Sequence, residues 1–151
     1  MTLPIQLRAL FFTCSALLIF FLSTPYMTAA SISYFLLLNG ALFCENRRIH
    51  AWLMSGGVLI DLSLVIFLEI SRSAIGEAIH SPLNPYQRGH IFCSILAVLL
   101  YIPAMLLGLK TIRAGKNKNQ LHRRIGQTAL FFRTLGFVLM FSLLAKIQSK
   151  L

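Results

Sequence analysis

The chain has 151 residues, enough for one domain, and 57% of them are hydrophobic while only 12% carry a charge. Soluble domains usually contain about 25% charged residues, so the composition excludes an ordinary soluble protein and predicts one integral membrane domain over residues 1–151. The net charge of +10 would suggest nucleic acid in a soluble protein. Here most basic residues lie between apolar segments, where they set topology and meet anionic lipid headgroups, so we expect no nucleic-acid binding.

A helix needs roughly 17–25 apolar residues to cross a bilayer, and five segments approach this length. The first, about 9–23, is either a retained transmembrane helix or a signal peptide, because a basic residue precedes it and small residues follow it. Further helices are expected at about 26–44, 50–71, 89–109 and 124–146. The predicted fold is therefore all-α: a polytopic transmembrane bundle of five helices, or of four helices plus an N-terminal signal-like helix.

The basic residues divide unequally between the two sides of this bundle, nine on one side and four on the other. The larger group comprises Arg8, Arg47, Arg48, Lys110, Arg113, Lys116, Lys118, Arg123 and Arg124. Loops rich in Lys and Arg stay in the cytoplasm, which predicts a multi-pass protein with a cytoplasmic N-terminus. We expect anionic lipid headgroups as partners of these loops.

Two opposite charges interrupt the apolar helices at the same depth. Asp61 lies 11 residues after His50, and Arg133 lies 11 residues after His122. Both helices start from the cytoplasmic side, so the two charges are expected near mid-membrane, where an unpaired carboxylate costs about 3 kcal/mol. We predict an ion pair between them, which requires the 50–71 and 124–146 helices to be neighbours.

Tyr101 completes the predicted polar core, because it lies 11 residues after His90 on a helix that enters from the opposite side. Asp61, Tyr101 and Arg133 are therefore expected to meet at the centre of the bundle. Such a buried pair either fixes the register of the helices without any chemistry or marks a functional site.

Histidines at the ends of the helices are candidate ligands for a transition metal or for haem iron. His50 and Met54 lie four residues apart on one helical face. Together with His122 they would make a soft nitrogen–sulfur site for copper, or an axial pair for haem. His90, with His80, offers a second position at the opposite side. We therefore take His50, Met54, His90 and His122 as candidate cofactor-binding residues, with the three helical histidines as metal ligands.

Other chemistry has little support in the sequence. Cys14, Cys44 and Cys93 form no CxxC pair, which excludes a disulfide framework or a zinc module and favours a packing role. The chain contains no nucleophile, phosphate-binding or dinucleotide motif. We therefore expect no enzyme activity.

Three stretches, "RRIHAWLM", "GHIFCSILAVLLYIP" and "LHRRIG", give the chain a family resemblance over about residues 26–146. It resembles a small bacterial membrane-protein family, the domain of unknown function numbered 420. The resemblance implies a four-helix protein of the inner membrane, linked with the assembly of haem–copper terminal oxidases. The residues that carry over are His50, Met54, His90 and His122.

Three functions agree with these features of the sequence. The first is an inner-membrane accessory or assembly factor for a respiratory complex, binding haem or copper through the histidines at the membrane edge. The second is a cofactor-free structural or interaction subunit of a membrane complex. The third is a small transporter or proton relay that uses Asp61. The first two predict another membrane protein as partner.

Overall fold

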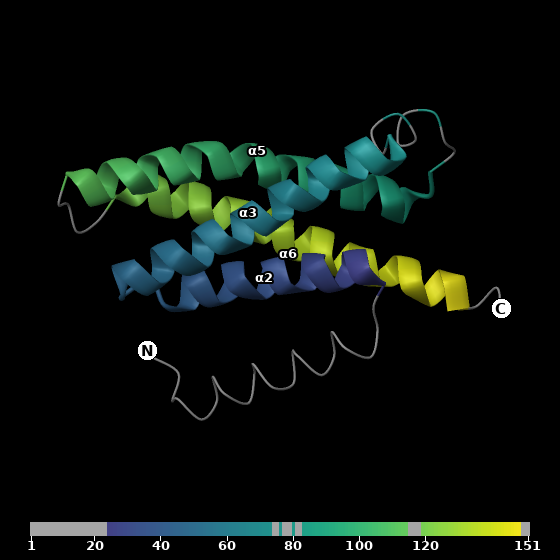
Figure 1. Ribbon diagram of the computed structural model, residues 1–151, viewed down its shortest axis with the longest axis horizontal. Helices are drawn as coiled ribbons and strands as arrows, with labels where there is room; N and C mark the ends of the chain where they lie inside the picture. The colour runs from purple at the N-terminus through teal and green to yellow at the C-terminus, as the bar shows by residue number, and fades with distance from the viewer. Residues whose placement is uncertain (1–23, 74–75, 77–79, 81–82, 115–118, 149–151) are drawn as a thin grey trace, which may run out of the picture.

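The computed structural model describes residues 24–73, 76, 80, 83–114 and 119–148. This part of the chain forms four principal helices: α2 (Pro25–Leu42), α3 (Arg47–Arg72), α5 (Pro85–Arg113) and α6 (Gln120–Gln148). They run alternately in opposite directions along one common long axis (Figure 1). The C-terminal end of α2 and the N-terminal end of α3 lie at the same end of the bundle as the C-terminal end of α5 and the N-terminal end of α6 (Figure 1).

The all-α class is confirmed, but the predicted five-helix transmembrane bundle is wrong. Among the residues described, only α3 and α5 contain stretches that are long and apolar enough to cross a membrane. In α2 the polar residues explain the difference, among them the buried Ser31, Ser33 and Asn39. The expected 9–23 helix lies outside the described residues.

Asparagine residues set where three of the helices begin. The side chain of Asn46 accepts a hydrogen bond from the backbone N–H of Ile49, and Asn119 accepts from those of Leu121 and His122. At the start of α5, the side chain of Gln87 accepts from the backbone N–H of Asn84. Such caps satisfy N–H groups that have no partner within the helix. With these caps the helices begin before their apolar runs. Several basic residues that were expected in loops from the sequence therefore lie in the terminal turns of helices.

The four helices form two tight hairpins, α2 with α3 and α5 with α6, which touch each other over shorter stretches. The limited contacts between the hairpins join α2 to α6 and α3 to α5. This order leaves α3 and α6 diagonally opposite, with no close approach of their backbones. The prediction that these two helices are neighbours is therefore wrong, although their side chains do meet.

Glycine allows α2 and α3 to approach closely. A Cβ atom on Gly57 would lie 2.7 Å from Cγ of Leu37, and one on Gly40 would lie 2.7 Å from Sδ of Met54. The hydroxyl of Ser33 also donates to the carbonyl of Gly57 at 2.9 Å. Small residues at a helix interface permit such packing and interhelical hydrogen bonding where lipid provides no hydrophobic driving force.

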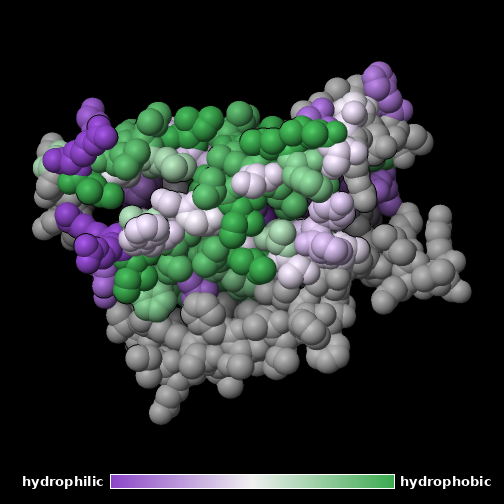
Figure 2. Space-filling model, in the orientation of Figure 1, coloured by the Kyte–Doolittle hydropathy of each residue, from purple (hydrophilic) through white to green (hydrophobic). Residues whose placement is uncertain are grey.

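On the face shown in Figure 2, large apolar side chains lie between two hydrophilic ends. In the apolar stretches of α3 and α5, only 17% of the residues are buried, whereas a core helix of a soluble protein would be mostly buried. The exposed residues include Leu59, Ile66, Ile70, Phe92, Leu99, Ile102, Leu106 and Phe131. An outward apolar surface of this extent favours a membrane environment.

Candidate functional site

The predicted ion pair is present at the centre of the bundle. Nη2 of Arg133 lies 2.7 Å from Oδ1 of Asp61, and Nε of Arg133 donates to Oδ2 at 2.8 Å. Each side chain is only 7% exposed. The guanidinium thus binds the carboxylate in a bidentate fashion, which is the strong and directional form of this interaction. The arginine side chain is long enough for Arg133 on α6 to reach Asp61 on the diagonally opposite helix α3.

Each of the four helices contributes one group to this central network. The hydroxyl of Tyr101 on α5 donates to Oδ2 of Asp61 at 2.8 Å, as expected from its depth. Nη2 of Arg133 also donates to the carbonyl oxygen of Ala30 on α2 at 3.0 Å. Both charges are therefore paired and further hydrogen-bonded, the condition under which buried charges are tolerated.

The central network is closed, which bears on what it can do. Oδ1 of Asp61 accepts from Arg133, and Oδ2 accepts from both Arg133 and Tyr101. Within the described part of the chain, every fully buried side-chain nitrogen or oxygen has a hydrogen-bond partner. This arrangement favours a fixed clamp between the hairpins over a proton relay.

A second contact crosses the same diagonal at the end of the bundle with the basic loops. The rings of His50 on α3 and His122 on α6 have centres 6.2 Å apart and planes at 87°. Equal spacing along both helices therefore brings together two pairs of side chains, His50 with His122 and Asp61 with Arg133. The two histidines therefore share one depth along the bundle, as the two charges do.

Both of these histidines are held by backbone carbonyls of the other two helices. Nδ1 of His50 lies 2.6 Å from the carbonyl oxygen of Gly40 on α2, and Nδ1 of His122 lies 3.0 Å from that of Ala104 on α5. A carbonyl oxygen only accepts hydrogen bonds, so Nδ1 must carry the proton in each ring. The lone pair of a neutral ring then lies on Nε2, and donation to a carbonyl in this way orients metal-binding histidines and raises their basicity.

The surroundings of His122 combine a close contact with open space. A Cβ atom on Gly108 of α5 would lie 3.1 Å from Cε1 of His122, so glycine at this position gives the imidazole room. One turn further along α6, a Cβ atom on Gly126 would meet nothing within 4 Å. Gly126 shares a helical face with His122 and with the buried Ala129, so this space lies between the histidine pair and the central network.

The remaining candidate ligands do not join the pair. Nδ1 of His90 lies 2.8 Å from the carbonyl oxygen of Gly136, which is 14 residues beyond His122 on α6, or roughly 21 Å along the helix. The sulfur of Met54 occupies the space above Gly40, and Met54 packs against the hydrophobic core. His80 is exposed. Among the residues described, no three His, Cys, Asp or Glu side chains form a metal-binding group.

Sequence reasoning missed the groups that orient the site, because they are backbone carbonyls. Ala30, Gly40 and Ala104 supply acceptors to Arg133, His50 and His122, and their side chains carry no chemistry. On α2, the buried Ser33, Leu37 and Gly40 repeat at helical spacing and would have marked its inward face.

The chain matches no protein-family model, no curated protein and no solved structure. The family resemblance proposed from the three sequence stretches therefore stays a prediction, and the function has to be argued from the geometry.

Proposed function

We propose that the protein is a non-enzymatic accessory factor of a respiratory membrane complex, and that it binds haem or copper at the His50–His122 pair. One observation carries this proposal: two histidines from diagonally opposed helices meet with their Nδ1 atoms held by carbonyls. That arrangement leaves the Nε2 atoms available for a transition metal. The resemblance to an oxidase-assembly family supports the same assignment.

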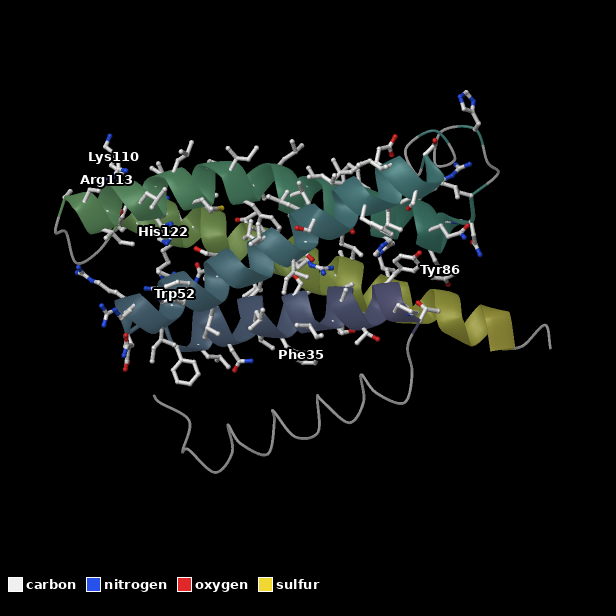
Figure 3. All side chains as sticks on the ribbon, viewed as in Figure 1. Phe35, Trp52, Tyr86, Lys110, Arg113 and His122 are labelled. Carbon is white, nitrogen blue, oxygen red and sulfur yellow. The ribbon has the colours of Figure 1, made fainter. Side chains whose placement is uncertain are left out.

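The distribution of charge and aromatic residues supports a location in a bacterial inner membrane, with the end that carries the His50–His122 pair in the cytoplasm. Lys110, Arg113 and His122 lie at one end of the bundle together with Trp52, and Tyr86 lies near the other end (Figure 3). Trp52 is 76% exposed and Tyr86 57%, as expected of aromatic residues at the two membrane–water interfaces. The basic end would meet anionic headgroups, and the apolar flank of α3 and α5 would face lipid and a partner membrane protein.

A metal and haem inventory of the full chain, purified in mild detergent, tests the proposal. We expect stoichiometric iron or copper in the native protein and its loss in both His50→Ala and His122→Ala. The matched control is His90→Ala, because His90 makes the same kind of Nδ1 contact at the other end of the bundle. If the native protein has neither a Soret band nor stoichiometric iron or copper, the metal-binding role is wrong.

The closed central network favours one alternative, a cofactor-free interaction subunit. In that case Asp61 and Arg133 join the two hairpins and thereby maintain a surface for another membrane protein, while the histidines only connect helices. Cells that lack the protein and receive a His50→Ala/His122→Ala double variant separate the two functions. Full restoration of respiratory-complex assembly by this variant would favour the cofactor-free subunit.

A further inference from the structure

The number of protein ligands at the His50–His122 pair restricts the chemical class of its ligand. The pair supplies two imidazole nitrogens, and no third His, Cys, Asp or Glu side chain joins them within the described residues. Bare copper and zinc ions in proteins usually take three or four protein ligands. Haem iron receives four nitrogens from its own macrocycle and needs only axial ligands from the protein. The count therefore favours haem over a bare ion.

The distance between the two imidazole rings agrees with haem as the ligand. A metal–imidazole bond is about 2 Å long, and the centre of the ring lies about 1 Å further on. Two imidazoles on opposite sides of one metal ion therefore have ring centres roughly 6 Å apart, and the rings of His50 and His122 are separated by 6.2 Å. Because α3 and α6 are diagonal partners without a close backbone approach, the two rings reach the site from opposite sides of the bundle.

Charge at this end opposes a bare cation and favours an anionic ligand. Arg48 lies two residues before His50, and Arg124 lies two residues after His122; both side chains are exposed. Of the four acidic residues in the chain, only Glu45 belongs to this end. Haem carries two peripheral carboxylates, which the net positive charge at this end would attract.

The fold also leaves room beside the histidines. The two hairpins touch only over short stretches, the inward position at Gly126 is open, and the surface is notched at the basic end (Figure 2). A flat ligand entering between the hairpins would reach the histidine pair without disturbing the central network.

We propose that the space between the hairpins binds haem, with His50 and His122 as axial ligands and with the positive charge of the basic end attracting its carboxylates. This inference rests on the proposed metal-binding function and goes further, because it excludes a bare copper ion as the ligand.

Titration of the purified full-length protein with iron(III) protoporphyrin IX tests the inference. We expect a saturable Soret change and a low-spin spectrum in visible absorption and electron paramagnetic resonance, as two axial imidazoles require. His50→Ala and His122→Ala should each abolish the low-spin signal and weaken binding at least about tenfold, while His90→Ala should retain both. Circular dichroism of each variant checks that the helices persist.

The role of the arginines has a test of its own. Arg48→Gln and Arg124→Gln should each weaken haem binding modestly, by up to about fivefold, because their exposed charges act at a distance, whereas Arg88→Gln, an exposed arginine at the opposite end, should not. The dimethyl ester of the same porphyrin should bind the native protein more weakly and should be insensitive to both arginine substitutions. This comparison uses the native fold and does not depend on the stability of a histidine variant.

The outcomes separate this inference from the function it rests on. Haem binding that survives both histidine substitutions, or an ester that binds as tightly as the acid, overturns the haem site as drawn here. Stoichiometric copper(I) binding that needs both histidines, without haem binding, overturns haem but keeps the metal-binding function. Failure of both probes overturns both proposals.

Discussion

At the scale of single residues, Asp61 and Arg133 show how two costly charges can coexist inside an apolar bundle. Alone, each would be an uncompensated buried charge. Together they form a bidentate pair, Tyr101 also donates to Asp61, and Arg133 also donates to the carbonyl of Ala30. A buried pair of this kind adds little to stability compared with well-packed apolar residues, but loss of one partner is expensive. The pair therefore specifies which helices meet and at what register.

Substitutions of the pair should show this asymmetry. We expect Asp61→Asn or Arg133→Gln to lower the free energy of unfolding by about 3–5 kcal/mol, because each leaves one buried charge without its partner. The double variant should recover more than half of the loss, because no uncompensated charge remains. Unfolding in mixed detergent, followed by circular dichroism, measures all three. If the double variant loses as much as the two single variants together, the residues are not coupled.

At the scale of helices, the sequence allowed the depth of side chains to be predicted but not the arrangement of the helices around the bundle. Depth follows from counting residues from a histidine at the membrane edge, so Asp61, Tyr101 and Arg133 could be placed at one level. Adjacency could not be deduced, since an arginine side chain is long enough to reach a diagonal helix as well as a neighbour.

The ends of the helices, and which helices are apolar enough to span a membrane, were less predictable for a different reason. Apolar composition predicts the hydrophobic part of a helix, whereas caps such as Asn46 and Asn119 decide where it begins. Hydropathy also does not distinguish polar residues that face inward, such as Ser33 on α2, from polar residues that face outward. The histidine pair was accessible to sequence reasoning, but its supporting carbonyls were not.

The pairing of α5 with α6 makes a prediction that needs only one new residue. A Cβ atom on Gly136 would lie 3.6 Å from Cβ of the native Cys93, within the range of about 3.5–4.5 Å seen in disulfides. We expect Gly136→Cys to form a disulfide with Cys93 under mild oxidation. After cleavage in the loop between α5 and α6, the two fragments should stay linked until they are reduced.

Gly126→Cys is the matched control, because a side chain at Gly126 has no neighbour within 4 Å at its Cβ. It should give no such link, and Cys93→Ala should abolish the link in the Gly136→Cys variant. A Gly136→Cys variant with two free thiols after oxidation would contradict the packing of these helices.

At the scale of the whole molecule, two hairpins are joined at two levels of the same diagonal. The charged pair holds the middle, and the histidine pair holds the basic end. The contacts between hairpins are otherwise limited, so a ligand at the histidine level would act on the relative position of the hairpins there. The central network would meanwhile keep their register. The bundle thus separates a site that has open space beside it from a clamp that has none.

The orientation of the whole molecule can be tested with a native thiol. Cys44 is exposed and lies between α2 and α3, at the end that carries the histidine pair, while Cys93 is buried. In a Cys14→Ser background, a membrane-impermeant maleimide should label Cys44 in inside-out vesicles but not in intact spheroplasts, because the basic end should face the cytoplasm.

A Cys14→Ser/Cys44→Ser/Tyr86→Cys variant should show the reverse pattern, since Tyr86 is exposed near the opposite end. Labelling of Cys44 from outside intact spheroplasts would invert the topology and place the histidine pair on the outer side of the membrane.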